Sequence, residues 1–469
     1  MGLFDKYEDV IRVLDPIRYM GKIRRVQGLV IESDGPPAVV GELCQIESRR
    51  TGDQVWAEVV GLTGSIVQLM PYTDVEGLQV GDDVIATGES LRVPVSDRLL
   101  GRVLDALGRP MDELGDVASS SFYPIIANPP DVLKRKAIRE QVATGIRSID
   151  GLVAVGKGQR LGIFSGSGVG KSTLVGMIAR NTSADVNVIA LIGERGREVR
   201  EFLESELGPE GLARSVVVVS TSNTPPLARL RAAYVATAIA EYFRDRGNDV
   251  MLLFDSVTRF ARAQREIGLT TGEAPATRGY PPSVFSTLPR LLERCGAGEN
   301  GTITGFYSIL VEGDDLDEPI SDTVRGILDG HLVLSRRLAQ RYHYPAVDVL
   351  GSVSRLSNKV TDVETQEAAG YVRRLLAVYR ESEDLINVGA YARGSNDEID
   401  EAIDKMPAIN RFLRQAVDER ADLGDTRREL KALAGIEDHD ADAPSEEAAP
   451  ADDRVPAVTA GAMQEDDGA

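Results

Sequence analysis

The sequence feature that most constrains the fold is a glycine-rich turn, Ser-Gly-Ser-Gly-Val-Gly-Lys-Ser, at residues 165–172. The apolar residues 161–164 before it are typical of a buried strand, and residues 171–180 after it are expected to form a helix. A turn of this kind lets several backbone N–H groups converge on one phosphate, and the N-terminus of the next helix adds its dipole. The sequence therefore predicts a phosphate-binding loop, with Ser165 where the pattern usually has glycine.

The loop and one later carboxylate predict Mg²⁺ and ATP as ligands. Lys171 is expected to reach the β- and γ-phosphates, and the hydroxyl of Ser172 to bind Mg²⁺. Asp255 ends the apolar run 250–254, so a parallel strand would deliver its carboxylate to the sheet edge that carries the loop, where it binds Mg²⁺ through water. The predicted nucleotide contacts are Ser165, Gly166, Ser167, Gly168, Val169, Gly170, Lys171, Ser172 and Thr173.

A charged segment, residues 193–198, follows another predicted strand, 186–192. Glu194 would therefore also lie at the carboxyl edge of the sheet, where it could orient and polarise the attacking water. Arg195 beside it is a further catalytic candidate. From the spacing alone, a solvated cluster of charges at a helix start is an equally good interpretation.

The chain around these motifs alternates between strand and helix, which predicts an α/β domain with a parallel sheet covered on both faces. Short β-rich runs at 28–31, 39–40, 56–60, 66–69 and 84–86 predict a small β-barrel before it, and residues 101–130 resemble a connector. Residues 362–433 are helical in pattern. We expect five parts: an amphipathic helix (1–20), a barrel (21–95), a P-loop domain (96–360), a helical domain (361–435) and a disordered acidic tail (436–469).

Taken together, the motifs resemble the catalytic subunits of rotary ATPases and their export-ATPase relatives. Residues 345–354, Pro-Ala-Val-Asp-Val-Leu-Gly-Ser-Val-Ser, match the ten-residue signature of that family. Arg355 follows it directly, at the position of the arginine finger that reaches the nucleotide of the neighbouring subunit. The resemblance implies a RecA-like ATPase core between an N-terminal β-barrel and a C-terminal helical domain, assembled as a homohexamer. It also supports Glu194 as the carboxylate that polarises the attacking water, and it assigns no residue to adenine.

Within the family the chain is most similar to the flagellum-specific type III export ATPases. The segments that carry the likeness are 101–105, 156–160, 193–199, 255–264, 279–285 and 311–331, within a resemblance that covers about residues 20–430. It implies an ATPase that energises chaperone release, unfolding and export of flagellar proteins. The alternatives are the ATPase of a virulence-type secretion system, a rotary synthase subunit and a ring-shaped RNA helicase.

Charge and hydropathy limit the partners. The net charge is −20. Residues 437–469 hold eleven acidic residues and one arginine, so this segment carries a charge of −10, half of the total. The rest of the chain is still acidic, which argues against a nucleic-acid partner. Neither a secretory signal nor a membrane span is found in the sequence, so we expect a cytoplasmic protein, and the resemblance implies that it associates peripherally with the inner face of the cytoplasmic membrane. The resemblance implies partners there: export-gate and stalk proteins, chaperone–substrate complexes and the membrane surface, the last through the first helix.

Overall fold

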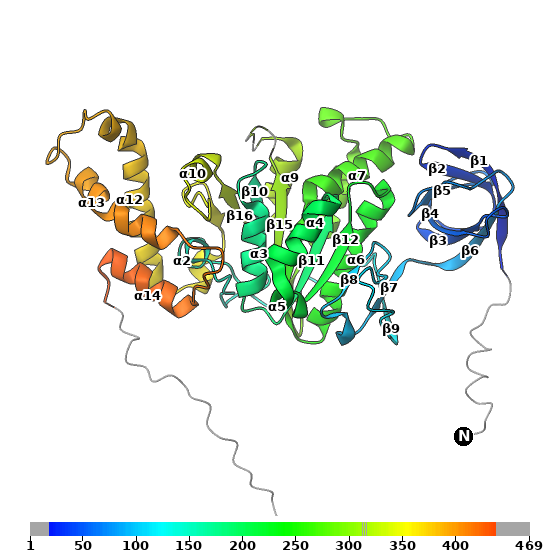
Figure 1. Cartoon of the computed structure of the whole chain (residues 1–469), viewed down its shortest axis with the longest axis horizontal. Helices are drawn as coiled ribbons and strands as arrows, with labels where there is room; N and C mark the ends of the chain where they lie inside the picture. The colour runs from blue at the N-terminus through cyan, green and yellow to red at the C-terminus, as the bar shows by residue number, and fades with distance from the viewer. Residues whose placement is uncertain (1–17, 312, 314, 316, 438–469) are drawn as a thin grey trace, which may run out of the picture. The chain divides into compact units, whose positions relative to one another are not determined.

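The computed structural model describes residues 18–311, 313, 315 and 317–437. Residues 1–17 of the predicted N-terminal helix (1–20) and almost all of the acidic tail lie outside these residues, and Met20 already belongs to a strand. The described part contains a barrel, a central sheet with helices on both faces, and a group of C-terminal helices (Figure 1). The predicted fold class is therefore confirmed.

Six antiparallel strands close the N-terminal barrel in the order β1-β2-β5-β4-β3-β6. They are β1 (Met20–Gln27), β2 (Val30–Asp34), β3 (Glu42–Glu47), β4 (Gln54–Thr63), β5 (Ile66–Pro71) and β6 (Asp83–Ser90). Alternate side chains fill the interior, as the strict alternation of buried and half-buried residues in β3 shows. The predicted strand at Val39–Val40 is wrong: both side chains are exposed, in the loop before β3.

The central sheet has the strand order β17-β16-β10-β15-β13-β11-β12-β8, and β14 pairs with β15 outside this path. All neighbours on the path are parallel except β16 and β17. The strands are β8 (Val103–Leu104), β10 (Arg160–Ser165), β11 (Val186–Ile192), β12 (Ser215–Ser220), β13 (Asp249–Asp255), β14 (Gly296–Ala297), β15 (Thr302–Leu310), β16 (Gly330–Leu334) and β17 (Val353–Ser354).

The segment expected to be a connector contributes to this sheet. β8 lies in it and extends the edge beside β12, while β9 (Ser121–Pro124) pairs with β7 (Arg92–Val95) in a separate two-stranded sheet. The sequence did not predict strands in this connector, because a strand of two residues such as β8 has no periodicity of its own.

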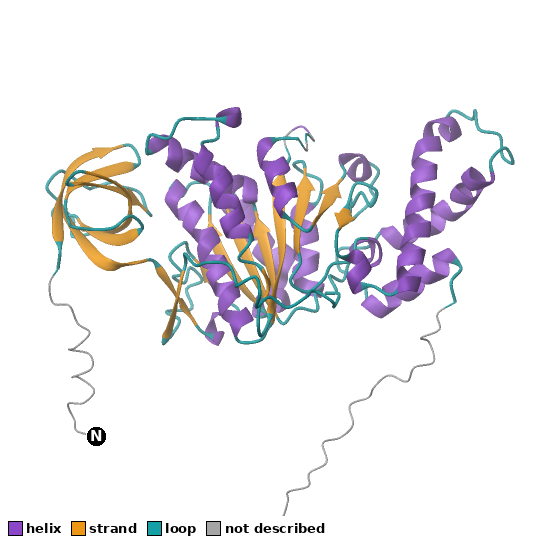
Figure 2. Ribbon diagram, turned by 180° about the vertical axis from the view of Figure 1, so that it is seen from behind, coloured by secondary structure: helices purple, strands orange, loops and turns teal. Residues whose placement is uncertain are grey.

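Helices cover both faces of the sheet (Figure 2). Val188 and Ala190 of β11 face one hydrophobic core, and Ile189 and Leu191 face the other. The helices of this region are α2 (Arg147–Leu152), α3 (Lys171–Asn181), α4 (Gly196–Glu201), the π-helical turn η2 (Phe202–Leu207), α5 (Gly208–Ala213), α6 (Pro226–Asp245), α7 (Val257–Thr270), α8 (Pro282–Leu292), α9 (Pro319–Ile327), α10 (Arg336–Gln340) and α11 (Ser357–Val360).

Three helices form the C-terminal group: α12 (Val363–Asn387), α13 (Asp397–Leu413) and α14 (Leu423–Ala434). Each begins at an acidic or amide side chain, Asp362, Asn396 or Asp422, that accepts backbone N–H bonds of the first turn. Phe412 and Leu430 join the second core under α2. The helical pattern predicted for residues 362–433 is thus present.

Candidate active site

The glycine-rich turn leaves the sheet at the end of β10 and enters α3 (Figure 1). Gly168 and Gly170 have φ angles of 75° and 92°, values that a side chain would strain. Gly170 caps α3, so the unpaired N–H groups of its first turn open toward the loop. Ser165, which replaces the usual glycine, is buried, and its hydroxyl has no hydrogen-bond partner among the described residues. The strand–turn–helix setting that the motif requires is therefore present.

Lys171 and Asp255 meet at the carboxyl edge of the sheet. Their side chains form an ion pair, because α3 starts beside β10 and Asp255 ends β13, two strands away. Ser308 of β15, the strand between them, donates its hydroxyl to Asp255 Oδ1 at 2.7 Å and lies 3.5 Å from Lys171 Nζ. The structure thus brings together the cation and the carboxylate that the sequence placed at one edge.

Glu194 follows β11, so its carboxylate reaches the same edge. Its Oε1 lies 3.9 Å from Lys171 Nζ, and only 16% of its side chain is exposed. Burial and the charge of Asp255 raise the pKa of Glu194 to about 7, although the ammonium of Lys171 acts in the opposite direction. Arg195 points to the rim: its side chain is 72% exposed and bonds Glu198 at 2.9 Å.

A cleft of about 440 Å³ opens over these groups, and we call it the phosphate cleft. Its walls include the glycine-rich turn, Ser172, Thr173 and Glu194. Ser172 is exposed to the cleft, whereas the hydroxyl of Thr173 donates to Glu206 of η2 at 2.9 Å. Backbone donors with one lysine suit a polyphosphate, and a hydroxyl with a carboxylate supplies the hard oxygen ligands that Mg²⁺ prefers. The residues present therefore fit Mg-ATP.

Arg355 lies away from the phosphate cleft. It follows β17, where Ser354 pairs with Gly330 at the start of β16, whereas the loop is level with Leu334 at the end of that strand. Four residue steps correspond to roughly 13 Å along a strand. The guanidinium is exposed, has no hydrogen-bond or ion-pair partner among the described residues, and borders a separate hollow with Arg325 and His331.

The comparisons with known proteins agree with this geometry. Family models match residues 23–88 (ATP synthase alpha/beta family, beta-barrel domain), 145–354 (ATP synthase alpha/beta family, nucleotide-binding domain) and 361–432 (T3SS EscN ATPase C-terminal domain). A flagellum-specific ATP synthase of Treponema pallidum is 59% identical over 92% of this chain and 97% of its own length. The chain belongs to the ATP synthase alpha/beta family, in its flagellar and type III secretion branch.

Two further comparisons bear on this branch. A flagellum-specific ATP synthase of Bacillus subtilis is 56% identical over 92% of this chain and 98% of its own length. The solved structure of the assembled ATPase EscN from the type III secretion system of enteropathogenic E. coli has a TM-score of 0.83 at 44% identity, and the match covers 88% of this chain and 99% of that one. The chain is thus an ATP hydrolase by family and by fold.

This ATPase also has a pocket that the sequence did not reveal. A cavity of about 330 Å³, the base pocket, adjoins the phosphate cleft at Gly168 and Gly170. Tyr344, Pro345, Met177 and Val417 supply most of its apolar wall. The Tyr344 ring lies 3.4 Å from the position that a Cβ on Gly170 would take. An apolar pocket with an aromatic wall beside a phosphate loop is suited to a nucleotide base.

Proposed function

We propose that this chain is the ATPase of a flagellar type III export apparatus, which hydrolyses Mg-ATP to energise chaperone release, unfolding and export of flagellar proteins. The observation that carries the proposal is the meeting of Lys171, Asp255 and Glu194 at the phosphate loop. It occurs in a chain that aligns over 92% of its length with flagellum-specific relatives.

Different residues of the site bind the phosphates and the base of the nucleotide, and these residues lie close together in the structure. The backbone of residues 165–170 and the ammonium of Lys171 bind the phosphates, while the base pocket takes adenine against Tyr344. The hydroxyl of Ser172 and, through water, the carboxylate of Asp255 would hold Mg²⁺, which would neutralise phosphate charge.

Glu194 orients the attacking water. Its carboxylate is buried in the wall of the phosphate cleft, and a pKa of about 7 lets it accept a hydrogen bond and a proton near neutral pH. Arg195 is exposed and its guanidinium donates to Glu198, so we assign it a role only in holding that side chain.

Arg355 completes the site of a neighbouring subunit. Its guanidinium has no partner among the described residues and lies away from the phosphate cleft of its own chain, which supports action in trans. Action in trans requires a ring, which we propose is a homohexamer. Replacing Arg355 with alanine should lower turnover by a factor on the order of 10³.

The EscN relative has been solved as an assembled ATPase, and also with its central stalk EscO. A stalk protein is therefore a proposed partner, facing the loop 272–282.

The remaining partners are proposed from the branch to which the chain belongs. The helices α12–α14 would receive chaperone–substrate complexes, and the assembly would meet the export gate at the inner face of the cytoplasmic membrane. Among residues 18–437, apart from 312, 314 and 316, no helix is long and apolar enough to span a bilayer. Association would therefore be peripheral for this part of the chain.

A gene replacement in the source bacterium tests the export role. A strain that carries Glu194→Gln should accumulate normal amounts of the protein but assemble no flagellar filament and secrete no flagellar subunits. Normal filaments would refute the proposal. Loss of virulence-protein secretion with intact filaments would favour the second candidate function, the ATPase of a virulence-type secretion system. That candidate is supported by a type 3 secretion system ATPase of Xanthomonas euvesicatoria, which is 52% identical over 90% of this chain.

A further inference from the structure

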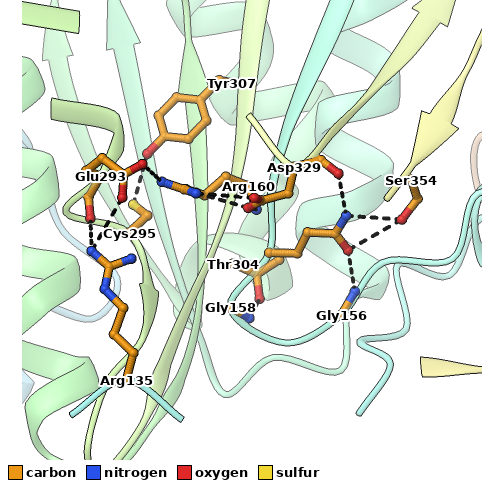
Figure 3. A network of polar contacts seen from close by, with 11 residues as sticks. Arg135, Gly156, Gly158, Arg160, Glu293, Cys295, Thr304, Tyr307, Asp329 and Ser354 are labelled. Atoms are coloured by element: carbon orange, nitrogen blue, oxygen red, sulfur yellow. Dashed lines mark hydrogen bonds and ion pairs between the residues drawn. The ribbon is translucent and has the colours of Figure 1, made fainter. Parts of the chain in front are cut away.

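A network of hydrogen bonds and ion pairs connects Asp329 with Ser354, the residue before Arg355 (Figure 3). Gln159 is its centre: the side chain is fully buried, accepts the N–H of Gly156 at 2.8 Å, and donates to the Asp329 carbonyl at 3.1 Å and to Ser354 Oγ at 3.0 Å. The amide thus uses its oxygen and its nitrogen at once, which fixes its orientation. It ties together the segments that flank β16 and β17.

Both segments hold the backbone of Arg355. The Asp329 carbonyl accepts the N–H of Arg355 at 3.0 Å, in addition to the bond from Gln159. Ser354, the residue before Arg355, donates its hydroxyl to the Ala154 carbonyl at 2.6 Å. The start of the Arg355 side chain is therefore fixed from two sides.

An ion-pair chain anchors Asp329 in turn. Its carboxylate receives the guanidinium of Arg160 in two contacts, at 3.0 and 3.2 Å. Arg160 also pairs with Glu293 at 2.6 Å, and Glu293 pairs with Arg135 at 3.5 Å (Figure 3). Planar two-point pairing of this kind fixes orientation as well as distance. The network therefore runs from α8 through β10 to the residue that precedes β16.

We propose that Gln159, Asp329 and Ser354 are positioning residues for Arg355, so that this network aims the guanidinium at the nucleotide of the neighbouring subunit. The inference rests on the proposed action of Arg355 in trans. The physical reason is a contrast: the fully buried Gln159 holds the two residues that fix the backbone of Arg355, whereas the guanidinium of Arg355 is exposed and has no partner among the described residues. A transition-state contact loses most of its effect when the group is displaced by about 1 Å.

Four variants test the proposal in the full-length chain. Gln159→Met keeps the size of the side chain but removes its hydrogen bonds, and Ser354→Ala removes only the hydroxyl. Ser354→Thr keeps the hydroxyl. Thr304→Val is the matched control, because it also removes one buried bond, from the Gly158 N–H at 2.9 Å, in a residue with no bond to Asp329 or Ser354.

We expect Gln159→Met and Ser354→Ala to lose about 10- to 100-fold in kcat. Binding of the fluorescent analogue mant-ATP should not change, because the phosphate cleft of the same chain is intact. Thr304→Val and Ser354→Thr should keep kcat. Unchanged kcat in both Gln159→Met and Ser354→Ala, or an equal loss in Thr304→Val, would overturn the inference.

Mixed assemblies separate this inference from the proposed function. Lys171→Ala chains have a disabled cleft but a normal Arg355, so mixing them with Gln159→Met chains should restore turnover in the Gln159→Met clefts. Arg355→Ala chains are the reference and should be restored in the same way. Restoration of the Arg355→Ala mixture alone would overturn the positioning role and leave the shared site standing. Restoration of neither mixture would overturn the shared site, and the inference with it.

Discussion

Lys171 and Asp255 are ion-paired although 84 residues separate them in the chain. Ser308 bonds the same carboxylate oxygen, so the pair is held from the strand between them. The proposed ligand would separate the two groups, since the lysine is needed at the phosphates and the aspartate at the metal. One buried ion pair would thus be exchanged for two contacts to Mg-ATP, and neither charge is left unpaired before or after.

Lys171→Ala should abolish both nucleotide binding and hydrolysis. It removes the cation from the phosphate cleft and leaves Asp255 as an unpaired buried charge that repels phosphate. Binding of mant-ATP, followed by fluorescence, measures the effect. Lys157→Ala is the control, because Lys157 pairs with Asp249 at the opposite end of β13 and should be dispensable. Normal turnover of Lys171→Ala would refute the site.

Glu194→Gln should bind Mg-ATP normally and lose most of kcat, by about 10²- to 10⁴-fold. The amide keeps the size of the side chain but cannot take a proton from the attacking water. Steady-state measurement of kcat and KM distinguishes a role in activating water from a role in binding substrate. Glu204→Gln is the matched control, since the Glu204 side chain is 60% exposed and pairs with Arg200. A raised KM at unaltered kcat would show that Glu194 binds substrate instead.

The pKa of Glu194, raised to about 7 by burial and by Asp255, predicts a pH dependence of activity. Because only the carboxylate accepts a proton, kcat/KM should rise with pH up to about 7 and then level off. The residual rate of Glu194→Gln should lack this step. A wild-type profile that is flat from pH 5 to 8 would contradict the assignment.

The same shift predicts a stability difference of known sign. The pKa is about 7 in the folded chain against a reference of 4.5, so the folded state keeps a proton that the unfolded state releases. The contribution of this proton to the free energy of unfolding is complete below pH 4.5 and is lost as the pH rises through 7. Glu194→Gln should therefore gain in Tm relative to wild type between pH 5 and pH 8, as measured by thermal unfolding. A constant difference in Tm would contradict the shift.

Tyr344→Ala should raise the KM for ATP about 5- to 150-fold, because stacking on a base is worth about 1–3 kcal/mol. Turnover at saturation should change little, since the base does not react. Tyr344→Phe keeps the ring and should behave as wild type. Tyr342→Ala, whose side chain is 86% exposed and outside the base pocket, is a second control. An unchanged KM for Tyr344→Ala would place the base elsewhere.

The central strands could be predicted because both of their faces are buried. A run such as 186–192, which is apolar apart from Asn187, has few alternatives to a buried strand, and β11 has those limits in the structure. The barrel strand β1 could not be predicted, because most of its side chains are not buried. Only Ile23 in it has an apolar side chain that is fully buried, so charged residues hide its alternation.

Part of the site could be predicted because its residues end strands or start a helix. Parallel strands bring their carboxyl ends to one edge, which places Lys171 and Asp255 together, whereas Glu194 was favoured only once the resemblance was taken into account. Tyr344 and Gln159 could not be found in this way. Their neighbours, Gly170 and Ser354, lie 174 and 195 residues away along the chain and are joined to them only by tertiary packing. Ser308 could not be singled out either, because Thr302, Thr304 and Tyr307 of the same strand also carry hydroxyl groups.

Turnover per chain, measured against protein concentration together with the mass of the assembly, tests the shared site most directly. If Arg355 of one subunit acts on the nucleotide of the next, turnover per chain should rise with concentration in parallel with the fraction of chains in rings. At dilutions where mass analysis finds only monomers, turnover should fall to the low level of Arg355→Ala. Full turnover per chain in those monomers would contradict the account.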